Sequence, residues 1–269
     1  MTDSLSRSEI VMDQWPSVAD SADRRAKLLR AGSLLLVLGL WELVGRQNAV
    51  FLSYPTAVAQ AAWEVLVLDD RLRSAFAETL HGYAVGFVAA TVLGTAIGFL
   101  MGQFKTFDVA LSPYVNALYA TPRIAIIPIL VLWVGIGFGL RVTIVILSAI
   151  FPIIITVRDG AKSVAAEYLD VARSFVANKW QTWRTTILPG SLPYVFSALR
   201  IGAQRSLIGI IVAETLAAVT GTGRMIQNYG QFFQTDRLLV PILVIGFFSI
   251  LMTSALHLLQ RKVTPWERR

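Results

Sequence analysis

Arg123, Gln204 and Glu214 stand within long stretches of mostly apolar, uncharged residues. A charge in such a place is costly, and it usually faces a polar cavity or a partner of opposite charge. Arg123 would attract an anion in such a cavity. Alternatively, it could hold backbone carbonyls that are freed by Pro122, because proline has no N–H to offer them. Glu214 could pair with Arg123 or Arg205, or lie beside them on the same path.

The chain lacks the residue patterns that are typical of catalysis or metal binding. It has no cysteine, and its two histidines, His81 and His257, are far apart and in no metal-ligand spacing. A serine protease would need a nucleophilic serine close to a histidine, and no Gly-x-Ser-x-Gly motif lies near His257. No glycine-rich loop ending in Gly-Lys-Ser/Thr is found, so nucleotide hydrolysis by that route is excluded. We therefore expect a non-catalytic protein that binds no metal and no cofactor itself.

The composition is that of an integral membrane protein. Charged residues make up 15% of the chain, well below the roughly 25% of soluble domains, and 55% of the residues are hydrophobic. The net charge of +7 could suggest a nucleic-acid partner. However, the basic residues cluster at the ends of apolar runs, which is typical of membrane proteins. We expect no nucleic acid to bind.

Apolar runs predict six membrane-spanning helices, and hence an all-α fold. The uncharged run from Gly82 to Gly102 is long enough for one span, and residues 109–157 are long enough for two. The predicted spans begin near residues 28, 82, 109, 142, 201 and 238. The first is short and is expected to end near Glu42. The glycine-rich turn at 135–139 separates the third from the fourth.

The third span is expected to be one helix that begins near Val109 and contains three prolines. At 1.5 Å per residue, Arg123 would then lie roughly 20 Å along it. Arg205 lies close enough to the end of the fifth span to extend its charge out of the membrane.

Residues 158–200 form the longest polar interruption of the apolar part of the chain. Val164, Tyr168, Val171 and Phe175 recur at steps of four, three and four, which places them on one face of a helix. A second helical piece follows a break at 178–179. Leu188-Pro189-Gly190 is expected to end it, because proline cannot continue a helix. The pattern predicts a docking surface, and an ordinary amphipathic helix on the membrane surface is the alternative.

This loop resembles the cytoplasmic EAA loop of ABC-importer permeases. Asp170 stands at the glutamate position of that motif, Val171 and Ala172 at its two alanines, and Leu188-Pro189 at its closing Leu-Pro. Val176 stands where the family usually has a glycine that allows a tight bend. We expect the bend to lie elsewhere, at Asn178, because asparagine tolerates left-handed geometry better than most residues.

The similarity covers most of the chain from Phe51 to the C-terminus. TPRIAIIPILVLWVGIGFG, LRIGAQRSLIGIIVAE and GTGRMIQNYGQFFQTDR resemble the nitrate/sulfonate/taurine branch of these permeases. That branch commonly has arginine after proline at the Arg123 position, so this arginine could serve the fold rather than a substrate.

The resemblance implies a homodimer of six-span subunits in the bacterial inner membrane, with the pathway at their interface. Two cytoplasmic ABC ATPase subunits would use ATP beneath it, and an extracytoplasmic solute-binding protein would deliver the solute. The excess of Lys and Arg in the tails and in the central loop predicts that both termini and this loop are cytoplasmic.

These expectations divide the chain into a polar arm (1–27), a six-span permease domain (28–260) with its coupling loop (158–200), and a basic tail (261–269). The residues expected on the substrate pathway are Arg123, Gln204 and Glu214. The residues expected to couple to the ATPase are Val164, Glu167, Tyr168, Asp170, Val171, Ala172, Arg173, Ser174, Phe175, Val176, Lys179, Leu188 and Pro189.

A channel or a secondary transporter that is not coupled to ATP is the main alternative. A secondary carrier would often show inverted repeats or paired acidic residues deep in its spans, and the sequence offers only Glu214. An exporter is disfavoured only by the resemblance. The substrate stays open, because the branch includes permeases for small oxyanions, alkylsulfonates and pyrimidine-type vitamin precursors. Arg123 favours an anion.

Overall fold

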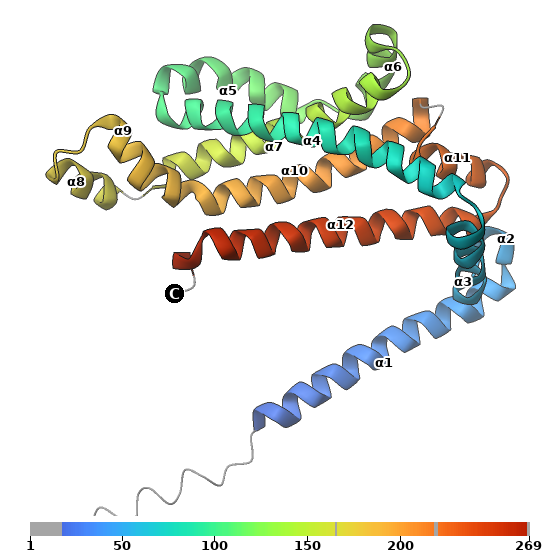
Figure 1. Ribbon diagram of the computed structural model, residues 1–269. Coiled ribbons are helices and arrows are strands. Elements are labelled where there is room, and N and C mark those ends of the chain that lie inside the picture. Colours follow the sequence, from blue (N-terminus) through green and yellow to red (C-terminus); the bar gives the residue numbers. More distant parts are fainter. Residues whose placement is uncertain (1–17, 165, 218–219, 268–269) are drawn as a thin grey trace, which may run out of the picture. The chain divides into compact units, whose positions relative to one another are not determined.

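The structure, a computed structural model, describes residues 18–164, 166–217 and 220–267. These residues form helices joined by short turns and contain no strand (Figure 1). Five helices are long and apolar enough to cross a membrane, and a bent pair of helices makes a sixth candidate. The expected all-α membrane fold is confirmed. The chain divides into two compact units, residues 1–59 and 60–269.

The first unit contains α1 (Val18–Gln47), α2 (Ala49–Leu52) and the start of α3 (Pro55–Trp63). The expectation that the first span ends near Glu42 is wrong, because α1 continues to Gln47. The Glu42 carboxylate has hydrogen-bond partners at this position. It accepts hydrogen bonds from Arg46 Nε at 2.8 Å and from the Thr56 backbone N–H at 3.1 Å.

The second unit holds the remaining helices. In chain order they are the π-helical turn η1 (Glu64–Leu68), α4 (Arg71–Gln103), α5 (Lys105–Ala120), α6 (Arg123–Val134), α7 (Phe138–Lys162), α8 (Ala166–Ser174), α9 (Lys179–Thr182), the π-helical turn η2 (Trp183–Ile187), α10 (Leu188–Ala217), α11 (Thr222–Gln231), α12 (Thr235–Val263) and the 3-10 turn η3 (Pro265–Glu267).

Glycines hold α4 against α7 (Figure 1). A Cβ added to any of five α4 glycines would lie only 2.5–3.0 Å from a side-chain atom of α7. Such a seam lets two helix backbones approach closely in a membrane. The facing pairs are Gly82 with Arg141, Gly86 with Val145, Gly94 with Ile153, Gly98 with Val157, and Gly102 with Ala161.

Because residue numbers rise together along this seam, α4 and α7 run parallel. The chain between them must therefore return to the end at which α4 began. At that end the rings of His81 and Phe138 stack with centroids 4.8 Å apart. At the other end, Lys162 of α7 forms an ion pair with Asp108 of α5. The pair α5–α6 accordingly crosses from one end of α7 to the other.

This crossing is broken, and the expectation of one continuous third helix is wrong. α5 ends at Ala120, α6 begins at Arg123, and the two helices are bent by 98°. The cause is local, since a residue before proline avoids the helical region. Thr121, which precedes Pro122, is extended at φ −67° and ψ 131°. Arg123 therefore begins a new helix at the break. The next predicted turn is confirmed by Gly135 and Gly137, which have positive φ angles of 77° and 134°.

α10 packs against both α7 and α4, and it runs antiparallel to α7. Gly202 faces Ile153 and Gly209 faces Ser148. The predicted helix stop at Leu188-Pro189-Gly190 is wrong, because α10 begins at Leu188. Proline is tolerated in the first turn of a helix, where its missing N–H has no partner to lose. α12 then lies along α10, and Arg200 donates a hydrogen bond to Gln260.

We predict that Gly98→Ala destabilises the permease domain by about 1–3 kcal/mol, the usual cost of overpacking a tight core. The new Cβ would lie 2.8 Å from Val157 Cβ and 2.9 Å from the Ile154 carbonyl oxygen. Thermal unfolding of the detergent-purified protein measures the loss. Gly246→Ala in α12 is the control, since nothing lies within 4 Å of that position. Equal melting temperatures for both variants would contradict the close-packed seam.

Candidate functional site

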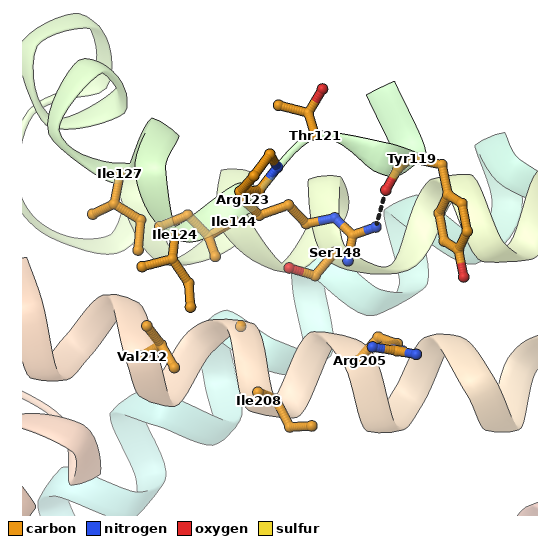
Figure 2. A pocket seen from close by; sticks show the side chains of 12 residues that line it. Tyr119, Thr121, Arg123, Ile124, Ile127, Ile144, Ser148, Arg205, Ile208 and Val212 are labelled. Carbon is orange, nitrogen blue, oxygen red and sulfur yellow. Dashed lines mark hydrogen bonds between the residues drawn. The ribbon is translucent and has the colours of Figure 1, made fainter. Parts of the chain in front are cut away.

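A cavity of about 420 Å³ lies between α6, α7 and α10, at the break between α5 and α6 (Figure 2). Its mostly apolar walls carry a few polar groups, as is common in binding sites for small molecules. The lining residues are Tyr119, Thr121, Pro122, Arg123, Ile124, Ile127, Ile144, Ser148, Arg205, Ile208, Gly209 and Val212.

The charge of this cavity is positive. Arg123 and Arg205 line it from opposite sides and no lining residue carries a carboxylate (Figure 2). The Arg123 guanidinium lies 5.5 Å from the centre of the Tyr119 ring, and its Nη2 donates to the Tyr119 carbonyl oxygen at 3.4 Å. Its Nε atom is buried without a hydrogen-bond partner among the described residues. The Ser148 hydroxyl adds a neutral donor to the wall between the two arginines.

Of the three predicted pathway residues, only Arg123 lines this cavity. Gln204 is exposed elsewhere on α10. The structure adds Arg205 and Ser148, which the sequence reasoning did not place here. Helical periodicity could have predicted the position of Arg205. It is four residues from Gly209, which is three residues from Val212, so the three share a face of α10.

Glu214 pairs with Arg141 of α7, so the expected pairing with Arg123 or Arg205 is wrong. Its carboxylate is fully buried, and its Oε1 lies 3.0 Å from Arg141 Nε. The Thr79 hydroxyl lies 2.8 Å from Glu214 Oε2, and the Gly223 backbone N–H donates to the same oxygen at 3.0 Å. Arg141, which stands just before the predicted start of the fourth span at 142, lies inside α7 and is 6% exposed.

The same network ties the segment before α11 to the helix bundle. Arg141 Nη2 donates to the Thr220 carbonyl oxygen at 2.7 Å and lies 3.1 Å from Glu78 Oε2. The Thr222 backbone N–H donates to the Thr79 hydroxyl at 2.9 Å. A buried charge is tolerated when it is paired and hydrogen-bonded in this way. Glu214 is therefore placed to hold α4, α7, α10 and α11 together, away from the cavity.

α8 exposes apolar side chains although it lies in the polar loop. Tyr168 and Val171 of α8, and Phe175 directly after its end, are 66%, 55% and 81% exposed. Residue Val164 lies before the helix and contacts Gly190 instead. The side chains of Glu167 and Arg173, two of the expected coupling residues, lie outside the described part of the chain. An exposed apolar face of this kind is typical of an interaction surface.

The bend after α8 lies at Val176 and not at Asn178. Val176 itself adopts a left-handed conformation with φ 55°. This costs a β-branched residue roughly 1–2 kcal/mol, and it explains why a glycine is favoured at such a position. Asn178 is extended and caps α9. Its side chain accepts from the Gln181 N–H at 2.9 Å, and the Gln181 side chain accepts from the Asn178 N–H at 2.8 Å.

Comparisons with known proteins agree with this architecture. The family of binding-protein-dependent transport system inner membrane components matches residues 90–269. The chain belongs to this family. The permease is 30% identical over 249 residues to the taurine transport system permease protein TauC of Escherichia coli (strain K12), with 90% of each chain covered. It is 28% identical to the putative aliphatic sulfonates transport permease protein SsuC of Bacillus subtilis (strain 168), over 86% of this chain and 84% of the relative.

Among solved structures, the fold is similar to a chain in inward-facing conformations of the MetNI methionine ABC transporter. The TM-score is 0.65 at 20% sequence identity, over 72% of this chain and 96% of the other. The expected branch and fold are thus confirmed. The chain is a permease subunit of an ABC importer, a multi-pass protein of the bacterial inner membrane.

We predict that Glu214→Ala destabilises the permease by about 3–5 kcal/mol, because among the described residues it leaves the buried Arg141 with only the half-exposed Glu78 as a counter-charge. Chemical unfolding in detergent measures the change. Glu64→Ala is the control, since the side chains of its ion pair with Arg237 are 52% and 43% exposed and such pairs contribute about 1 kcal/mol at most. Similar losses for the two variants would show that the buried network is not a structural support.

Proposed function

We propose that this permease imports a small anion, such as a sulfonate or nitrate, and that the cavity between α6, α7 and α10 lies on its path. The pair of arginines in a mostly apolar, carboxylate-free wall carries the proposal. Two guanidinium groups offer forked donors that suit an oxyanion, and Ser148 adds a hydroxyl. The permease names of the relatives, taurine and aliphatic sulfonates, are consistent with a sulfonate.

The break between α5 and α6 suits such a path. It puts extended backbone at Thr121 and Pro122 on the cavity wall, where irregular backbone can be satisfied by water or by the solute. Arg123 sits at this break. A shift of α6 relative to α10 would move Arg123 with respect to Arg205, and would thereby change the affinity for the anion.

We further propose that α8 docks into an ATPase subunit and transmits its movement to α10. The apolar face formed by Tyr168, Val171 and Phe175 would bury itself in the ATPase. η2 runs directly into α10, which carries Arg205. Asp170, Ala172, Ser174, Val176, Leu188 and Pro189 complete the proposed coupling region.

In the assembly that we propose, two copies of this chain meet two ATPase subunits and one extracytoplasmic solute-binding protein. Both termini and the α8 region face the cytoplasm. ATP is hydrolysed by the ATPase subunits, and this chain performs no catalysis.

We predict that Arg123→Gln and Arg205→Gln each lower the uptake of an anionic solute at least tenfold. Each removes one charge-assisted pair from the cavity, about 1.5–3 kcal/mol of solute affinity. Uptake of a radiolabelled sulfonate and of nitrate into proteoliposomes of the whole importer measures the effect. Lys105→Gln, at the start of α5 and outside the cavity, is the matched control. Unchanged anion uptake by both arginine variants, or equal loss for a neutral pyrimidine, would overturn the anion proposal.

We predict that Phe175→Asp lowers recovery of the ATPase with the tagged permease by more than tenfold, because it puts a charge into the centre of an apolar contact. Co-purification from the native membrane, with the ATPase quantified by mass spectrometry, measures the recovery. Thr106→Asp adds the same charge at an exposed position of the first turn of α5, at the same end of the spans, and should leave recovery intact. Full recovery with Phe175→Asp would remove α8 from the interface.

A further inference from the structure

An apolar groove of about 970 Å³ lies where the end of α4 meets α9 and η2. It is separate from the arginine-lined cavity and shares no residue with it. Eight of its lining side chains are apolar, namely Ala96, Phe99, Leu100, Phe104, Ala177, Trp180, Trp183 and Ile187. The others are Gln103, Thr182 and Lys179, so the groove has one positive charge and no carboxylate.

From the length of the apolar run in α4, we expect the groove to lie at the boundary of the membrane. The uncharged run of α4 extends from Gly82 to Gly102, roughly 30 Å at 1.5 Å per residue, which matches the hydrocarbon core. The groove takes in the last two turns of this helix. Trp180 and Trp183 stack with ring centroids 5.1 Å apart, and Phe99 meets Trp183 edge to face at 6.1 Å. Such aromatic clusters are typical of the level of the lipid headgroups.

The walls of the groove are open to their surroundings. Trp180, Leu100 and Phe104 are 65%, 44% and 54% exposed. An occupant must therefore offer apolar groups to these walls and a negative group to the Lys179 ammonium. Within the described residues, Lys179 forms no ion pair and is free to bind such a group. A lysine ammonium is a compact charge with three donors and binds phosphate well.

We propose that this groove binds an anionic phospholipid, with an acyl chain along Phe99, Leu100 and Trp183 and its phosphate beside Lys179. The apolar walls and the tryptophan pair suit the acyl chain and the interfacial part of a phospholipid. The single cation favours an anionic lipid, because a neutral lipid gains nothing from the positive charge. The bound lipid would tie α9 and η2 to the bilayer. These two turns connect α8 to α10, so the lipid would steady the segment between the proposed docking helix and the cavity.

Photolabelling tests this proposal directly, because it measures the binding of lipid and not transport. The full-length permease, with the partners that purify with it, is placed in phosphatidylcholine nanodiscs that contain a small fraction of photoactivatable phosphatidylglycerol. Labelled peptides are identified by mass spectrometry. The expected labels fall on residues 96–104 and 177–187.

Lys179→Glu should lower this labelling about fivefold or more, the effect of removing one lysine from an anionic headgroup, while Lys179→Arg should retain it. Lys262→Glu, at the end of α12, is the matched control and should leave the labelling unchanged.

Three outcomes would overturn the proposal. Equal labelling of the groove by photoactivatable phosphatidylcholine would show an apolar surface without headgroup preference. Labelling that persists in Lys179→Glu would remove the lysine from the site. Cross-links from these residues to a second copy of the chain or to another protein, in place of lipid, would show that the groove is a protein interface. None of these outcomes affects the proposed anion path, because the two sites share no residue.

Discussion

The close approach of α4 to α7 is the constraint on which the second unit depends. Five glycines of α4 face five residues of α7 in register, with no room for a side chain between them. Because the two helices run parallel, the chain between them must return across the membrane, and α5–α6 makes this crossing. α10 then packs against α7 through Gly202 and Gly209. The arginine-lined cavity lies between α6, α7 and α10, at positions that this packing fixes.

The buried ion pair of the fold and the arginines of the proposed anion path are separate groups of charges. The Glu214–Arg141 pair is enclosed by Thr79 and by the backbone of Thr220 and Gly223, and it fastens the start of α11 to the bundle. Arg123 and Arg205 instead face open space without a carboxylate among the residues around them. A buried charge whose partner is built into the fold has little left to offer a solute. Two cations that share a cavity without a counter-ion leave their charge for a bound anion to neutralise.

Sequence patterns revealed the features that depend on local spacing. Apolar runs predicted the number of spans, glycines predicted the turn at 135–139, and the spacing of apolar residues predicted the amphipathic pattern of α8. Each of these features depends on residues that are close together in the chain. The break at Thr121-Pro122 was missed although proline is visible in the sequence, because several prolines are accommodated within helices here, such as Pro113 and Pro152. The pairing of Glu214 with Arg141 could not be predicted, since it joins residues 73 positions apart through the packing of α7 on α10. The bend at Val176 was missed because a β-branched residue rarely adopts positive φ.

The central claim is that a solute anion is held between Arg123 and Arg205. An electron cryo-microscopy structure of the assembled importer, trapped with its solute bound, tests this claim most directly. We expect density for the anionic group within hydrogen-bond distance of both guanidinium groups and of the Ser148 hydroxyl, at the break between α5 and α6. Solute density elsewhere in the assembly, with this cavity empty or filled only by water, would contradict the account.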